Sequence, residues 1–175
     1  MLIRGYETQR TDSFAYLTTT MKRMFGHALA DEGDALVRFA LAQVQALRKC
    51  EVPASSLILA KSCKGRMGSN GEVDFTKDYA NPDSMAQVRV AKQRIEHGLG
   101  FTSGMKVSYI VTDAGKRPMT VTPWLDTEEH QASASYDGQF YAERLAAAVG
   151  RITEAFDWDA KELMAGNKQA SLFSF

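Results

Sequence analysis

The apolar positions of this sequence recur at helical spacing in three separate segments. Between residues 12 and 49, two such stripes stand on either side of Gly33-Asp34, which predicts two antiparallel helices joined by a short turn. Thr11-Asp12-Ser13 is expected to cap the first helix, because short polar side chains accept hydrogen bonds from the free amides there. The first stripe consists of Phe14, Leu17, Met21, Met24 and Ala28, and the second contains Leu36, Val37, Leu41, Val44 and Leu47.

Two further helices follow from the same spacing. A shorter one is expected over residues 84–97, with Asp83-Ser84 as its cap and Gly98 just past its end. A long, strongly patterned helix is expected over residues 137–156, where Asp137 precedes a regular apolar face. That face consists of Tyr141, Leu145, Ala148, Ile152 and Phe156.

Strands are expected where short apolar runs replace the helical spacing. These runs occupy residues 2–8, 57–60, 107–111 and 119–121. The last run can pair back on the third across a turn at 113–116, and the glycines and asparagines of 63–82 indicate an exposed loop or hairpin. The sequence therefore predicts a helix-dominated α+β fold with a helical hairpin, a small β-sheet with one helix, and a long C-terminal helix.

Composition is that of an ordinary globular protein. The 175 residues, 45% hydrophobic and 24% charged, suffice for one core or for two small helical lobes with a mixed segment between them. No apolar run approaches the roughly 20 residues of a membrane span, and the first residues lack a signal-peptide pattern. Cys50 and Cys63 lack the paired spacing of a zinc site, so we expect two reduced thiols in a cytoplasmic protein.

Charge is balanced overall but unevenly distributed. The chain has 21 basic and 21 acidic residues, whereas the segment 61–94 carries seven basic and four acidic residues, a local charge of 7 − 4 = +3. The segment 126–162 has the opposite balance. This asymmetry permits a nucleic-acid face in the first segment, and it is equally compatible with an ordinary solvated surface.

The sequence contains no motif of a self-contained active site. Asp157-Trp158-Asp159 has the spacing of a metal-binding carboxylate pair, but its place at the end of the long helix favours helix caps. Gly98-Leu99-Gly100 and Gly104 follow a helix rather than a strand, which indicates a loop instead of a phosphate-binding turn. The three histidines, His27, His97 and His130, are far apart and are expected to have surface or packing roles.

The last seven residues form a separate candidate motif. Gln169 is followed at intervals of three by Leu172 and Phe175, which suits a peptide that places two apolar side chains in the groove of a sliding DNA clamp. Residues 164–168 have the composition of a flexible tether. The alternative is a tail that packs on its own domain. Phe173 adds a second possibility, because residues 169–173 also resemble the pentapeptide that binds the bacterial clamp.

In order along the chain, these segments resemble the C-terminal end of a family B DNA polymerase of archaeal type, namely the last part of the palm and the thumb. Residues 5–12 resemble the Gly-x-Glu-x-x-Arg-x-Asp passage between palm and thumb, and residues 104–111 resemble the Gly-x-x-Val-x-Tyr-Val-Ile strand. Further matching segments are Leu57–Lys61, Asp78-Tyr79, Val88–Ala91 and Tyr136–Phe156. The chain departs from the family at Ala86-Gln87, Met105, Arg144 and Ala147, and residues 65–76 resemble an insertion.

The resemblance implies a division into the end of a palm (1–10), a thumb (11–163) and a flexible clamp-binding tail (164–175). It implies that the chain grips the backbone of a primer–template duplex, with contacts from Arg10, Lys61, Lys64, Arg66, Arg89 and Lys92. The tail would bind a sliding clamp through Gln169, Leu172, Phe173 and Phe175. The family's catalytic aspartates lie upstream of this segment. We therefore expect no catalytic residue, metal or cofactor in the chain itself, with Mg²⁺ held by the complete polymerase.

Two questions remain open at this stage. The chain is either the small subunit of a split polymerase, with a catalytic palm subunit as partner, or a fragment of a full-length enzyme. The alternative function is a stand-alone adaptor that binds a clamp and makes no DNA contact of its own. As part of a polymerase, the chain would be nucleoid-associated in the cytoplasm, and no membrane partner is expected.

Overall fold

The computed structural model describes residues 13–30 and 32–168, and these form two compact units. Unit 1 combines the segment up to Ser56 with the segment from Asp137 onward, and unit 2 consists of Leu57–Tyr136. Six α-helices and a small three-stranded sheet lie in the described residues, which confirms the predicted helix-dominated α+β class. The predicted strand at 2–8 lies outside the described residues.

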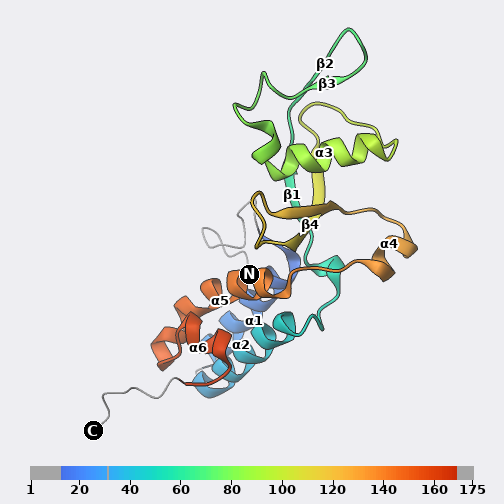
Figure 1. The fold of residues 1–175 in the computed structure, drawn as a ribbon. Coiled ribbons are helices and arrows are strands. Elements are labelled where there is room, and N and C mark those ends of the chain that lie inside the picture. Colours follow the sequence, from blue (N-terminus) through green and yellow to red (C-terminus); the bar gives the residue numbers. More distant parts are fainter. Residues whose placement is uncertain (1–12, 31, 169–175) are drawn as a thin grey trace. The chain divides into compact units, whose positions relative to one another are not determined.

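Unit 1 is helical (Figure 1). Its elements are α1 (Ala15–Leu29), α2 (Gly33–Arg48), the 3-10 turn η2 (Ala54–Ser56), α5 (Gly138–Thr153), the 3-10 turn η4 (Glu154–Phe156) and α6 (Ala160–Ala165). The Tyr16 hydroxyl donates to Gln43 Oε1, 2.5 Å away, and the Arg23 guanidinium lies 4.6 Å from the centre of the Phe39 ring. The first contact joins the start of α1 to the later part of α2 and the second joins the middles of the two helices, so the predicted antiparallel hairpin is confirmed.

The core of unit 1 lies between the hairpin and α5. The predicted face of α5 is buried at Tyr141, Leu145 and Ala148, and the rings of Phe14 and Tyr141 meet edge to face with centroids 5.1 Å apart. Helix α5 begins as predicted, because the Asp137 carboxylate accepts a hydrogen bond from the Phe140 amide at 3.0 Å.

Unit 2 consists of a sheet covered by one helix, with a hairpin at one end of the unit (Figure 1). Strand β1 (Leu59–Ser62) pairs with β4 (Lys106–Asp113), which pairs with β5 (Thr120–Pro123), and both pairings are antiparallel. Helix α3 (Ala86–Glu96) packs on this sheet through Val88 and Ala91. The remaining elements are the hairpin strands β2 (Arg66–Met67) and β3 (Val73–Asp74), the 3-10 turn η3 (Pro82–Ser84) and α4 (Glu128–Ser133).

Two of the predicted helix caps are wrong at the residues that the structure describes. Helix α1 has Phe14 as its N-cap residue without a side-chain cap, because burial of the ring fixes Phe14 while Ser13 bonds the Thr18 hydroxyl instead. Helix α3 has Met85 as its N-cap residue. Ser84 donates to the Asn81 carbonyl at 2.7 Å within η3, so its hydroxyl is engaged in the preceding turn.

Three predicted boundaries also shift. Strand β1 begins two residues later than expected, and the apolar stripe of α1 ends at Met24 because Ala28 is exposed. Phe156 lies in η4, beyond the end of α5 at Thr153, and is 39% exposed rather than part of the buried face. Helix α6 was not predicted, and it includes the first two residues, Met164 and Ala165, that the sequence analysis assigned to the tether.

Candidate nucleic-acid interface

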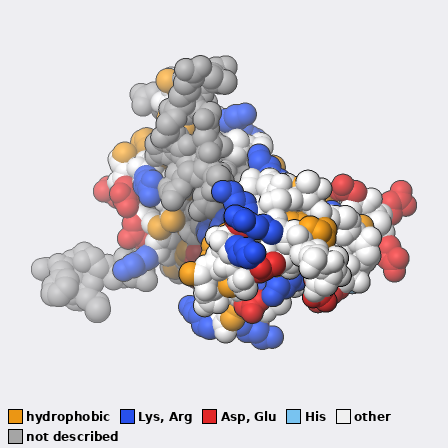
Figure 2. All heavy atoms as spheres, turned by 90° about the horizontal axis from the view of Figure 1, so that it is seen from above, with side chains coloured by type: hydrophobic (Ala, Val, Ile, Leu, Met, Phe, Trp, Pro, Cys, Tyr) orange, Lys and Arg blue, Asp and Glu red, His pale blue; other side chains and the backbone are white. Residues whose placement is uncertain are grey.

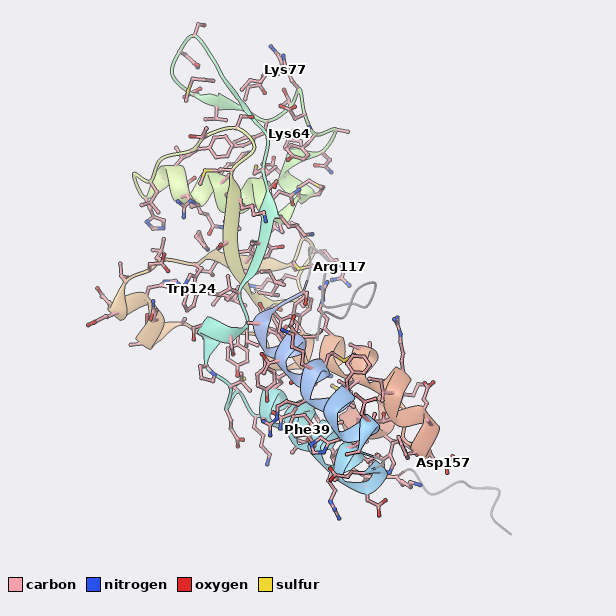
Figure 3. All side chains as sticks on the ribbon, turned by 180° about the vertical axis from the view of Figure 1, so that it is seen from behind. Phe39, Lys64, Lys77, Arg117, Trp124 and Asp157 are labelled. Atoms are coloured by element: carbon pink, nitrogen blue, oxygen red, sulfur yellow. The ribbon has the colours of Figure 1, made fainter. Side chains whose placement is uncertain are left out.

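The predicted DNA-binding residues that the structure describes all lie in unit 2. Lys61 is on β1, Arg89 and Lys92 are on α3, and Lys64 and Arg66 are at the base of the β2–β3 hairpin. In Figure 3, Lys64 and Lys77 lie toward the hairpin end of the unit, and Arg117 lies toward its opposite end. Arg10 and the clamp-binding residues lie outside the described residues.

Strand alternation directs Lys61 toward the helix. Lys61 is opposite Val107 in the β1–β4 ladder, and Leu59 is opposite Tyr109, so these four side chains share one face of the sheet. Val107 and Tyr109 are buried there, and α3 packs against β1, β4 and β5. Lys61 is therefore held half-buried beside α3 instead of extending freely into solvent.

A cleft of about 580 Å³ opens where β1, the start of α3 and the β4–β5 turn converge. Its cationic lining consists of Lys61, Arg89 and Arg117, and its remaining lining residues are Ser84, Met85, Ala86, Gln87, Pro118 and Met119. None of these described lining residues is acidic. Three positive charges thus converge on one cleft without a carboxylate among its lining residues.

Arg89 is positioned by the β4–β5 turn. Its Nη1 atom donates to the Met119 carbonyl at 2.5 Å, whereas its buried Nε–H has no partner in the described chain. An N–H that is buried without an acceptor costs free energy, which a ligand acceptor entering the cleft would recover. Arg89 is therefore held in place by one hydrogen bond and keeps an N–H group that can donate to a ligand.

Lys92 is in a different situation. Its Nζ lies 2.6 Å from the Asp83 carboxylate, and the two side chains are 44% and 75% exposed. Such an exposed pair adds little stability, but the carboxylate offsets the charge that Lys92 offers to a polyanion. The structure does not bring Lys92 into the cleft lining.

Arg66 and Lys64 belong to the hairpin rather than to the cleft. Arg66 is opposite Asp74 in the β2–β3 ladder, and both Lys64 and Arg66 are exposed. Hydrogen bonds from the Thr76 hydroxyl and amide lower the pKa of Asp74, so this carboxylate stays ionised near Arg66. In the view from above, blue Lys and Arg side chains are grouped near the middle of the picture, and red Asp and Glu side chains are visible on both sides of it (Figure 2).

Arg117 was not among the predicted contacts. It follows the turn at 113–116, which the sequence analysis identified, and its Nη1 donates to the Ala114 carbonyl at 3.0 Å. The signal that identifies it is the pairing of β5 with β4, because this pairing returns the chain after Arg117 to the edge beside α3. A basic residue in that turn therefore belongs with Lys61 and Arg89.

The carboxylates near the end of α5 serve the helices. Asp159 accepts from the Glu162 amide at 2.8 Å and Glu162 accepts from the Asp159 amide at 3.0 Å, a capping box that confirms the predicted cap. Among residues 13–30 and 32–168, no cluster of three His, Cys, Asp or Glu side chains is suited to a metal ion. Over the same residues, no helix is long and apolar enough to cross a membrane.

Comparison with models of known protein families yields no match. A search of curated proteins likewise finds no match.

Proposed function

We propose that this chain is the thumb part of a family B DNA polymerase, which holds the backbone of a primer–template duplex and tethers the enzyme to a sliding clamp. The observation that carries the proposal is the cleft of unit 2, where Lys61, Arg89 and Arg117 converge. Together with the order of the polymerase-like segments along the sequence, this cleft favours contact with a polyanion over a purely adaptor role.

The chemistry of the cleft suits backbone binding rather than sequence reading. Lysine and arginine donate to phosphate oxygens, which are the same for every sequence, and a polymerase must hold all sequences equally. Lys64 and Arg66 on the hairpin would extend the contact along the duplex. Mg²⁺ and the catalytic carboxylates belong, in this proposal, to the palm of the complete enzyme, and the chain alone is expected to extend no primer.

Duplex binding measured at several salt concentrations tests the proposal. A fluorescent primer–template duplex should bind weakly, with an affinity that falls steeply as salt rises, because each phosphate contact releases counterions. The double variant Lys61→Gln/Arg117→Gln should bind with a shallower salt dependence. The slope of the logarithm of the association constant against the logarithm of the salt concentration should decrease in magnitude by about 0.9 for each phosphate that the variant no longer neutralises. An unchanged affinity and slope would refute this assignment of the cleft.

The clamp contact is tested separately. The proposed tail residues are Gln169, Leu172, Phe173 and Phe175. Leu172→Ala with Phe175→Ala should abolish co-purification with a sliding clamp and leave duplex binding unchanged. Phe173→Ala should weaken binding only to a clamp of bacterial type. Clamp binding by a chain that binds no duplex would instead identify an adaptor.

A further inference from the structure

The start of α3 leaves backbone donors facing the cationic cleft. The amides of Ala86 and Gln87 have no acceptor among the described residues, because the first intrahelical bonds come from Val88 and Arg89 to the Met85 carbonyl. No side chain caps this helix of 11 residues. Free N–H groups at a helix start, with the positive end of the helix dipole, attract anions.

Gln87 adds a side-chain donor to the cleft. The residue is 8% exposed and lines the cleft, and its side-chain amide makes no hydrogen bond to the described residues, so it is available to a ligand. A buried donor without a partner among the described residues is also present in the lining, the Nε–H of Arg89, whereas buried polar groups in folded proteins are nearly always hydrogen-bonded. The amide N–H₂ of Gln87 is a donor that an acceptor oxygen inside the cleft would satisfy.

The surrounding groups restrict the chemistry of that acceptor. Lys61, Arg89 and Arg117 are cations, the α3 amides are donors, and no described lining residue is acidic. An oxyanion with several acceptor oxygens can bind the amides, the Gln87 side chain and a guanidinium together. A lone carboxylate has two oxygens for these donors, whereas a phosphate group offers more.

We propose that this cleft is a binding site for a single phosphate group. The group would be held by the backbone amides of Ala86 and Gln87 and by the side chains of Gln87, Lys61 and Arg117, and Arg89 would form the wall of the site. The proposal deepens the proposed function and rests on it for the source of the phosphate group. That source would be a phosphodiester of the duplex backbone. The site itself depends only on the geometry of unit 2. It fixes one phosphate in place, whereas Lys64 and Arg66 contribute charge without a cavity.

The test is a titration of ¹⁵N-labelled protein with inorganic phosphate, followed by the amide resonances of Ala86 and Gln87. Both should shift saturably, while chloride at matched ionic strength should leave them in place. Gln87→Leu, which preserves side-chain volume, and Arg117→Gln should each weaken phosphate binding several-fold. Lys106→Gln is the matched control, because Lys106 is an exposed cation opposite Ser62, on the other face of the sheet from Lys61.

A second titration with a primer–template duplex separates the two proposals. Shifts of the same amides, reversed by excess phosphate, support both the site and its source. Phosphate shifts without duplex shifts support the site and contradict the DNA role of the cleft. Duplex binding that leaves the Ala86 and Gln87 amides unmoved, with no phosphate response, overturns the site and leaves the proposed function standing. A phosphate response equal in the Gln87→Leu and Lys106→Gln variants also overturns it.

Discussion

Replacing Gly138 with alanine would place a methyl group in space that the end of α2 already occupies. A Cβ built on Gly138 would overlap the Leu47 carbonyl oxygen and lie 2.8 Å from Cys50 Sγ. Real Cβ atoms essentially never approach another heavy atom that closely, so the start of α5 or the end of α2 has to move. Because one overlapping atom belongs to the backbone, a side-chain rotation cannot relieve the contact.

The expected cost follows from this overlap. Forcing an extra methyl group into a packed interface destabilises proteins by about 1–3 kcal/mol. For a chain of this size, each kilocalorie shifts the melting temperature by roughly 2–4 °C, so Gly138→Ala should lower it by about 2–12 °C. Cys50→Ala removes the sulfur overlap but not the carbonyl overlap. The double variant should therefore recover only part of the stability.

Urea unfolding followed by tryptophan fluorescence gives the measurement. The chain has two tryptophans, Trp158 in unit 1 and Trp124 in unit 2, so a Trp124→Phe background reports unit 1 through Trp158. Gly138→Ala should lower the unfolding midpoint in that background. Gly26→Ala is the matched control: Gly26 is exposed within α1, its added Cβ meets nothing within 4 Å, and alanine there should stabilise by about 0.5–1 kcal/mol. Equal midpoints for the Gly138→Ala variant and its parent would refute the close approach of α5 and α2.

Four further outcomes are expected. Thr153→Val should destabilise unit 1 by about 1–3 kcal/mol, because the buried hydroxyl donates a hydrogen bond to the Trp158 carbonyl at 2.7 Å and valine leaves that carbonyl without a donor. Thr153→Ser keeps the donor, so it should lower the free energy of unfolding less in the same urea assay. Burial raises the pKa of the Cys63 thiol above its usual 9.0, so the free energy of unfolding should fall as pH rises beyond 9.0, and Cys63→Ala should remove that part of the pH dependence. A thiol reagent should modify exposed Cys50 in the folded protein and Cys63 only after unfolding. Lys92→Gln should reduce duplex affinity less than Lys61→Gln, since its ammonium is already paired, and an equal reduction in an anisotropy titration would contradict that assignment.

Periodicity predicted α1, α2, α3 and α5 because each buries one continuous face, whereas the six-residue helices α4 and α6 were not predicted. Leu145 and Ala148 recur at the spacing of a helix that packs on a core, and both are buried. The ends were harder to predict, because they depend on contacts made elsewhere in the fold. Phe14 stands at a helix start because its ring packs on Tyr141, more than a hundred residues away, and no local pattern contains that contact.

The candidate site was predicted only in part for the same reason. Lys61 and Arg89 were chosen from local charge, and the structure brings them to one cleft. Arg117 lies outside the segment where basic residues concentrate, and it reaches the cleft through strand pairing, which the sequence analysis expected without fixing its register. The role inferred for Gln87 depends on its place in the lining of the cleft, a property of the folded chain that composition does not encode.

The assembly of unit 1 from two distant segments sets an order of events during synthesis. The hairpin of α1 and α2 is synthesised before α5, the helix that covers its apolar face, because α5 starts only at Gly138. Residues 57–136 are made in between, and at about 5–20 residues per second this takes roughly 4–16 s. Leu36, Val44 and Leu47 lack the cover of α5 during that interval, whereas unit 2 is one continuous segment and needs no later part of the chain. Aggregation or chaperone capture of the nascent chain should therefore centre on the hairpin, and slowing translation across unit 2 should increase both.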